Sequence, residues 1–173
     1  MKAAVVFESR TGNTSLLANA IASALGESCV VCSALVGDGA VKRLDEAETV
    51  FVGFWTDRGT CSPTLMDFLD TLSGKDVFLF GTAGFGGQSE YFDGILDKVA
   101  ACIPEGNNLL GTYMCQGKMP HAVRERYADM LEDLEAQEDA ARIEAMIANW
   151  DRAADHPDEE DLERLRAIVE GLC

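Results

Sequence analysis

Ser9-Arg10-Thr11-Gly12-Asn13-Thr14 is a short polar stretch that joins two apolar segments of different periodicity. A continuous apolar run, residues 3–7, precedes it and is typical of a buried strand. Apolar residues then recur at positions 16, 17, 20, 21 and 25, which is the spacing of an α-helix. The sequence therefore predicts a strand, a tight polar loop and a helix in that order.

The start of this helix is rich in groups that bind anions. Backbone N–H groups in a first helical turn lack intrahelical partners and carry partial positive charge. Gly12 lets the backbone pass close to a ligand, and the hydroxyls of Ser9, Thr11 and Thr14 can add donors. A phosphate-binding loop is predicted; an ordinary strand-to-helix turn with good capping residues is the alternative.

The composition of the loop narrows the kind of phosphate. A triphosphate-binding loop ends in Gly-Lys-Ser/Thr, and this loop contains no lysine. A dinucleotide-binding loop has three spaced glycines, and only Gly12 is present. The loop therefore fits a terminal monophosphate better than a triphosphate or a pyrophosphate.

Length, hydropathy and charge bound the class of protein. The 173 residues, 47% of them hydrophobic, suit a single domain over 1–173, and no apolar run approaches the roughly 20 residues of a membrane span. The first residues predict a buried strand rather than a signal peptide, so we expect a cytoplasmic protein. A net charge of −16 repels nucleic acid and anionic membranes and attracts basic proteins, with solubility as the alternative explanation.

The six cysteines do not indicate a redox or metal site. Cys29 and Cys32 form a Cys-x-x-Cys within an apolar run, where residues three apart face opposite sides of a strand. Without a secretory context we expect buried, reduced thiols rather than disulfides. No cluster of histidine, cysteine and aspartate has the spacing of metal ligands, so no metal is expected.

Strands and helices alternate along the chain. We expect strands at about 2–8, 28–34, 49–55, 76–81 and 108–115, with helices at about 13–25, from Pro63 to Gly74, and at about 89–102. Three strands are apolar without alternation, as in a parallel sheet covered on both faces. The fold class is therefore α/β, a doubly wound five-stranded parallel sheet in three α/β/α layers that binds ligands at the carboxyl ends of its strands.

The polar loop also carries a resemblance to a known family. Ser-x-Thr-Gly-x-Thr directly after the first strand resembles the FMN phosphate loop of the flavodoxins. The resemblance covers about residues 2–115 and implies the strand order 2-1-3-4-5, with FMN held non-covalently by three loops. The implied cofactor-binding residues are Ser9, Arg10, Thr11, Gly12, Asn13 and Thr14 for the phosphate, and Trp55, Thr56, Asp57, Arg58, Gly59, Thr82, Ala83, Gly84, Phe85 and Gly86 for the isoalloxazine ring.

The two ring loops depart from the family pattern. Asp57 stands at the usual tryptophan position and Gln88 at the usual tyrosine position. Trp55 either stacks on the ring or packs in the core, and Phe85 is the nearest other aromatic residue. In flavodoxins one peptide of the second loop turns over when the flavin is reduced; by position this is Arg58–Gly59, where Gly59 permits a type II turn.

Residues from about 120 to 173 form a charged extension in which apolar stripes predict three helices. A simple flavodoxin needs one helix there, so the others either cover the sheet or form a docking surface, and we favour cover.

Cys61 and Cys115 fall near the predicted site, but no histidine is close in sequence, and no catalytic residue is assigned.

The resemblance implies an FMN-binding electron carrier that passes single electrons between a reductase and an acceptor enzyme, and the acidic surface favours basic partners. An FMN-dependent NAD(P)H:quinone oxidoreductase is the first alternative, and it requires an open pocket over the ring. A flavin-free regulatory or scaffold module of the same fold is the second.

Overall fold

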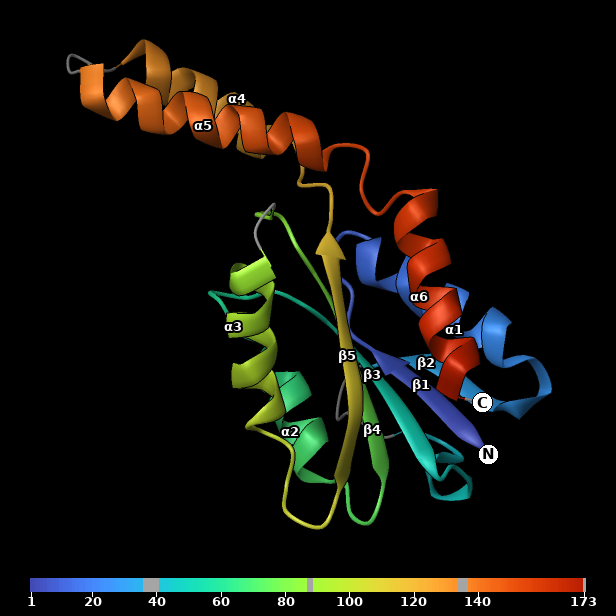
Figure 1. Cartoon of the computed structure of the whole chain (residues 1–173). Helices are drawn as coiled ribbons and strands as arrows, with labels where there is room; N and C mark the ends of the chain where they lie inside the picture. The colour runs from blue at the N-terminus through green and yellow to red at the C-terminus, as the bar shows by residue number, and fades with distance from the viewer. Residues whose placement is uncertain (36–40, 87–88, 134–136, 173) are drawn as a thin grey trace.

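The computed structural model describes residues 1–35, 41–86, 89–133 and 137–172, in which a central sheet lies between two layers of helices (Figure 1). The five strands are all parallel and their order is β2-β1-β3-β4-β5, which confirms the predicted fold class and topology. Their bounds are β1 Ala3–Phe7, β2 Cys29–Ala34, β3 Thr49–Trp55, β4 Asp76–Ala83 and β5 Asn108–Gln116.

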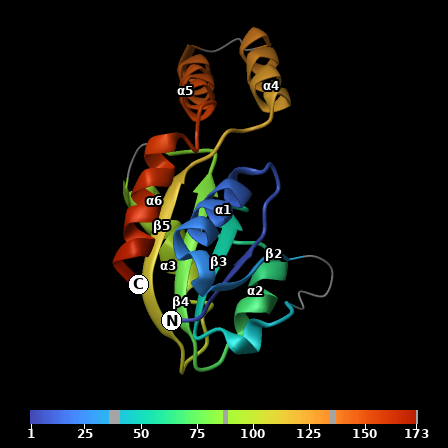
Figure 2. The same cartoon turned by 90° about the vertical axis from the view of Figure 1, so that its right-hand side faces the viewer.

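Two helices cover each face of the sheet. Helices α1 (Asn13–Leu25) and α6 (Glu159–Leu172) lie on one face, and α2 (Pro63–Asp70) and α3 (Ser89–Ala100) lie on the other (Figures 1 and 2). Ser62 caps α2 as its hydroxyl accepts from the Leu65 N–H at 3.2 Å. The helix ends at Asp70 rather than at Gly74, because the next amides turn back to the carbonyls three residues earlier.

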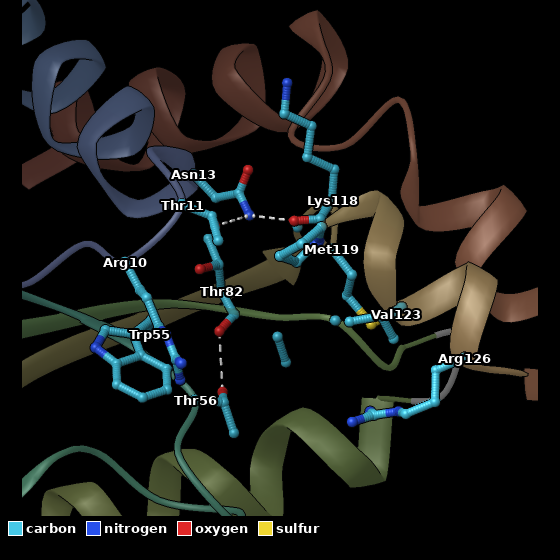
Figure 3. Close-up of a pocket in the computed structure, with 14 residues that line it drawn as sticks. Arg10, Thr11, Asn13, Trp55, Thr56, Thr82, Lys118, Met119, Val123 and Arg126 are labelled. Carbon is cyan, nitrogen blue, oxygen red and sulfur yellow. Dashed lines mark hydrogen bonds between the residues drawn. The ribbon is translucent and has the colours of Figure 1, made fainter.

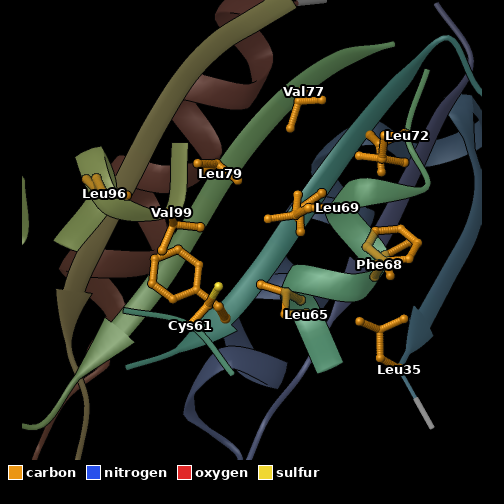
Figure 4. Close-up of a cluster of buried hydrophobic side chains, with 14 of the residues drawn as sticks. Leu35, Cys61, Leu65, Phe68, Leu69, Leu72, Val77, Leu79, Leu96 and Val99 are labelled. Atoms are coloured by element: carbon orange, nitrogen blue, oxygen red, sulfur yellow. The ribbon is translucent and has the colours of Figure 1, made fainter. Parts of the chain in front are cut away.

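Each face of the sheet has its own apolar core. Leu65, Leu69 and Val99 from α2 and α3 are fully buried against one face (Figure 4). On the other face the core includes Leu17, Ile21, Leu165 and Val169 from α1 and α6. Strand β1 is therefore buried on both sides along its whole length, which explains its continuous apolar sequence.

The C-terminal helices divide into two groups. Helix α6 covers the sheet, whereas α4 (His121–Glu132) and α5 (Gln137–Ala153) pack against each other and project beyond the carboxyl end of the strands (Figure 1). We call α4 and α5 the α4–α5 hairpin. The Lys118 N–H donates to the His156 carbonyl at 2.8 Å, so the chain leaves and rejoins the sheet at one place. The preference for sheet cover is wrong for the two extra helices, α4 and α5, whereas α6 is the one covering helix that a simple flavodoxin needs (Figure 1).

Strand β2 lies at the edge of the sheet and is less buried than predicted. Cys29 is half-buried and Cys32 is exposed, so the expectation of a buried pair is wrong for Cys32. The cysteines at positions 29, 32, 61, 102 and 115 are free thiols.

None of the helices in the described part of the chain is both long enough and apolar enough to cross a bilayer.

Gly53 in β3 provides a test of the side-chain packing between β1, β3 and β4. An added Cβ there would overlap the Phe80 ring and lie 2.8 Å from the Phe7 Cβ. Gly53→Ala should therefore lower the free energy of unfolding by about 1–3 kcal/mol, measured by urea denaturation. The matched control is Gly94→Ala in α3, where no atom lies within 4 Å of the added Cβ and a gain of about 0.5–1 kcal/mol is expected. A Gly53→Ala protein as stable as the wild type would contradict this packing.

Candidate functional site

The carboxyl end of the sheet carries two adjoining cavities. The first has a volume of about 440 Å³ and lies between the start of α1, the ends of β3, β4 and β5, and the start of α4 (Figure 3). The second, of about 330 Å³, shares Thr56, Ala83, Gly84 and Met119 with the first. Each volume lies within the range of small-molecule sites in proteins.

Most of the predicted site residues meet at these cavities. The first is lined by residues from all three predicted loops, namely Arg10, Thr11, Asn13, Trp55, Thr56, Thr82, Ala83 and Gly84. The second adds Arg58, Gly59 and Phe85. The remaining predicted residues line neither cavity: Ser9, Gly12, Thr14, Asp57 and Gly86.

The predicted phosphate loop, residues 9–14, is held in shape by its own polar side chains. Gly12 caps α1 with a left-handed φ of 89°, and the Ser9 hydroxyl accepts from the Ser15 N–H at 3.3 Å. The Thr14 hydroxyl is buried and bonds inward, 3.3 Å from the Phe54 carbonyl and 3.1 Å from the Thr82 hydroxyl. Thr14 therefore fastens α1 to the sheet, while Thr11 faces the cavity.

Asn13 links the phosphate loop to the segment after β5. Its side chain is buried, and Nδ2 donates to the Thr11 hydroxyl and to the Lys118 carbonyl, both at 2.9 Å. Gly117 makes this approach possible, because an added Cβ would lie 2.7 Å from Asn13 Nδ2. The buried Oδ1 of Asn13 has no hydrogen-bond partner in the described part of the protein. The sequence did not predict Gly117 and Lys118, although their position directly after the last strand was an available signal.

The charge around the cavities is opposite to that of the whole chain. Arg10, Lys118 and Arg126 line the first cavity and Arg58 the second, whereas no described aspartate or glutamate lines either one. Such a local excess of cations, in a chain of net charge −16, favours an anionic ligand. Arg126 and Val123 come from α4, so the hairpin contributes a wall that sequence reasoning did not predict (Figure 3).

Aromatic side chains stand at both cavities. Trp55 is half-buried in the first, and the Arg10 guanidinium lies over its ring, 5.2 Å from the centroid. Phe85 and Tyr91 line the second, each with about 40% of its surface exposed. Tyr91, on α3, was not among the predicted residues, and Gln88 lies outside the described residues. Trp55 and Phe85 are thus both available to a planar ligand.

The turn at 57–60 is closed by backbone hydrogen bonds and has two residues with positive φ. Arg58 and Gly59 both have a left-handed backbone, with φ of 49° and 82°. Asp57 and Thr60 exchange two backbone hydrogen bonds of 2.8 and 3.0 Å. Positive φ at both central residues is the signature of a type I′ turn, and the type II form that Gly59 permits when the flavin is reduced stays a prediction.

The two buried thiols near the site are poor nucleophiles. Cys61 is 1% exposed, and burial raises the pKa of its thiol to about 11. Cys115 is 4% exposed, and burial raises its pKa as well, helped by the charges of Asp161 and Asp158. Both groups are protonated at neutral pH, whereas the thiolate is the reactive form.

A cluster of His156, Asp158 and Asp161 stands at the start of α6, although the sequence indicated no metal-binding group. Their ligand atoms lie within 4.8 Å of one another. The three residues are already hydrogen-bonded to one another. His156 Nδ1 lies 2.6 Å from Asp161 Oδ2, and the side chains of Asp158 and Asp161 each accept a hydrogen bond from the backbone N–H of the other residue. The arrangement is that of a reciprocal helix cap.

Comparison with known proteins places this geometry in a family. The model of the flavodoxin domain matches residues 4–170. The chain belongs to the flavodoxin family. A flavodoxin-like domain-containing protein BilS from Clostridium symbiosum is 38% identical over 175 residues, covering 94% of this chain and 90% of the relative.

Solved flavodoxin structures share the fold. A short-chain flavodoxin associated with a bacterial microcompartment has a TM-score of 0.61 at 21% identity, covering 99% of this chain and 97% of its own. A flavoprotein from Lactobacillus acidophilus in complex with FMN has a TM-score of 0.54 at 14% identity, covering 65% of this chain and 92% of its own. At these identities the likeness shows the fold of a flavodoxin.

The burial of the thiols is open to a direct test. Iodoacetamide at neutral pH should modify exposed Cys32 in the native protein well before Cys61 and Cys115, because the latter two are inaccessible. Peptide mass spectrometry with time gives the order. In urea all three should react at similar rates, and rapid native labelling of Cys115 would contradict the structure.

Proposed function

We propose that this flavodoxin binds FMN non-covalently and carries electrons between a reductase and an acceptor protein. The observation that carries the proposal is the cavity at the N-terminus of α1, directly beside the Ser9–Thr14 loop, which is lined by cations and by no aspartate or glutamate of the described residues. Helix N-termini and arginines are favourable neighbours for a phosphate group. The solved flavoprotein with FMN has the same fold, which supports the choice of cofactor.

The residues present fit FMN in size and in chemistry. Thr11 and the start of α1 suit the phosphate, and the unsatisfied buried Oδ1 of Asn13 is an acceptor that a ribityl hydroxyl can serve. Trp55 and Phe85 offer apolar surface for the ring. When bound, FMN supplies the redox chemistry, while this chain binds it, orients it and limits the access of water.

The acidic surface supports a basic partner. The cations gathered at the cavities leave the rest of the chain even more negative than its net charge of −16 indicates. Long-range attraction of this kind raises the rate at which a basic protein meets its partner.

A second candidate is an FMN-dependent NAD(P)H:quinone oxidoreductase. The observation in its favour is the second cavity, of about 330 Å³, which adjoins the first and is lined by Arg58, Phe85 and Tyr91. A small acceptor could enter there beside the flavin. Turnover of NADPH or NADH with a soluble quinone by the FMN-loaded protein would favour this enzyme, and its absence would favour the carrier.

The assignment of the phosphate site makes a prediction about ligand preference. Thr11→Ala should weaken FMN binding by about 1–3 kcal/mol and leave riboflavin binding nearly unchanged, because riboflavin has no phosphate. Quenching of flavin fluorescence gives both dissociation constants. The control is Thr71→Ala, which removes a hydroxyl bonded to the Phe68 carbonyl away from the cavities and should affect neither ligand. Equal losses for FMN and riboflavin would place the phosphate elsewhere, and colourless protein that binds no flavin would favour the scaffold alternative.

The proposed partner chemistry predicts a salt dependence. Electron transfer from the photoreduced FMN-loaded protein to cytochrome c, used as a basic haem acceptor, should slow steeply as the salt concentration rises. At 0.1 M salt, exposed charges more than about 10 Å apart are largely screened from each other. Stopped-flow absorbance measures the rate. Reduction of ferricyanide, an anion, should instead accelerate, and equal salt responses for both acceptors would assign the acidity to solubility alone.

A further inference from the structure

We propose that the α4–α5 hairpin is part of the flavin site and that Asn149 is the residue through which it positions the ring-binding loop. The proposal rests on the FMN binding proposed above. It goes further because it assigns a role to the α4–α5 hairpin, which does not cover the sheet. We call residues 82–86 the ring-binding loop.

A closed set of hydrogen bonds joins the hairpin to that loop. Asn149, near the end of α5, is 5% exposed, and its Nδ2 donates to the Gly84 carbonyl at 3.0 Å. Gln116, the last residue of β5, donates from Nε2 to the Asn149 Oδ1 at 3.0 Å and to the same Gly84 carbonyl at 3.1 Å. Three segments far apart in sequence therefore meet at one carbonyl oxygen.

These bonds determine which way the peptide after Gly84 faces. A trans peptide directs its carbonyl and its N–H in opposite directions. Gly84 lines both cavities, whereas neither Asn149 nor Gln116 lines either one. With the carbonyl held on the side of Asn149, the Phe85 N–H is directed to the opposite side, where it can donate to a polar edge of the flavin ring.

The base of the hairpin packs against the same point. Met119 fills the space beside Gly84, where an added Cβ would lie 2.6 Å from the Met119 Sδ. The Trp150 indole N–H donates to the Pro120 carbonyl at 3.2 Å, which ties the end of α5 to the start of α4. A protein that docked on the projecting hairpin and displaced it would therefore disturb the ring-binding loop through the bonds of Asn149.

A purely structural role for Asn149 is the competing explanation. Asparagine is a poor residue for a helix interior, so its presence near the end of α5 is not explained by the stability of the helix. Its hydrogen bonds could nevertheless serve only to attach the hairpin to the sheet. The two roles differ in their effect on bound flavin, since attachment alone affects the stability of the protein and leaves the reduction potential unchanged.

The experiment compares Asn149→Ala with a matched asparagine at the opposite end of the sheet. Asn107 also makes several hydrogen bonds to backbone groups, with its Nδ2 donating to the Leu72 and Pro104 carbonyls at 3.0 Å. We measure the FMN dissociation constant by fluorescence, the two-electron midpoint potential by redox titration, and the thermal unfolding of the FMN-free proteins. Asn149→Ala should weaken FMN binding by roughly 5- to 30-fold, the scale of one lost buried hydrogen bond.

The midpoint potential separates positioning from attachment. The variant weakens the binding of oxidised FMN and of reduced FMN by two factors. Each tenfold difference between these factors shifts the two-electron potential by about 30 mV. Asn149→Ala should shift this potential, whereas Asn107→Ala should lower the melting temperature and leave the potential and FMN affinity unchanged. A lower melting temperature for Asn149→Ala with unchanged affinity and potential would overturn the proposal.

Gln116→Ala covers the case in which Asn149→Ala does not fold. It removes the second donor to the Gly84 carbonyl and the bond from Gln116 to Asn149, leaves every residue of the hairpin in place, and should shift the potential in the same direction. If both proteins fold, the double variant should show less than the sum of the two effects, because the residues share one acceptor. An unchanged potential in Gln116→Ala would overturn the proposal, whereas failure of the wild type to bind FMN would overturn the proposed function instead.

Discussion

Strands β1 and β3 are buried on both faces, and most of the architecture follows from that burial. Apolar strands of this kind need helices on each side, and successive parallel strands need a crossover to connect them. The crossovers bring the loops after β1, β3 and β4 to the same edge of the sheet. The cavities lie at that edge because the backbone groups that end strands and begin helices are free there to meet a ligand.

The electrostatics of the molecule are divided in space rather than uniform. In the described part of this chain of net charge −16, four cations line the two cavities and no carboxylate does. The surface can therefore attract basic proteins while the site attracts an anion. The same separation means that the net charge of this chain says little about its ligand, although it bears on its protein partners.

The α4–α5 hairpin lies between β5 and α6 in the chain and projects away from the sheet (Figure 1). Because its two ends meet at the hydrogen bond between Lys118 and His156, α4 and α5 can be added after β5 without disturbing the sheet. Helix α6 then resumes the cover of the sheet with Leu165 and Val169. The insertion nevertheless reaches the site, since Val123 and Arg126 line the first cavity and Asn149 contacts Gly84.

The sequence alone determined the elements and the strand order, because periodicity, turn residues and a short motif are local signals, and the phosphate site at residues 9–14 stays a prediction. It did not determine that Thr14 bonds inward, that Gly117 packs against Asn13, or that Arg58 takes a left-handed φ. Each of these outcomes depends on residues from other parts of the chain, or from the other side of a turn, that fold against the residue in question. The contact between Asn149 and Gly84 spans 65 residues, and only the tertiary structure could decide it. The periodicity of α4 and α5 predicts that they are helices, but the direction in which they leave the sheet depends on their contacts with the sheet.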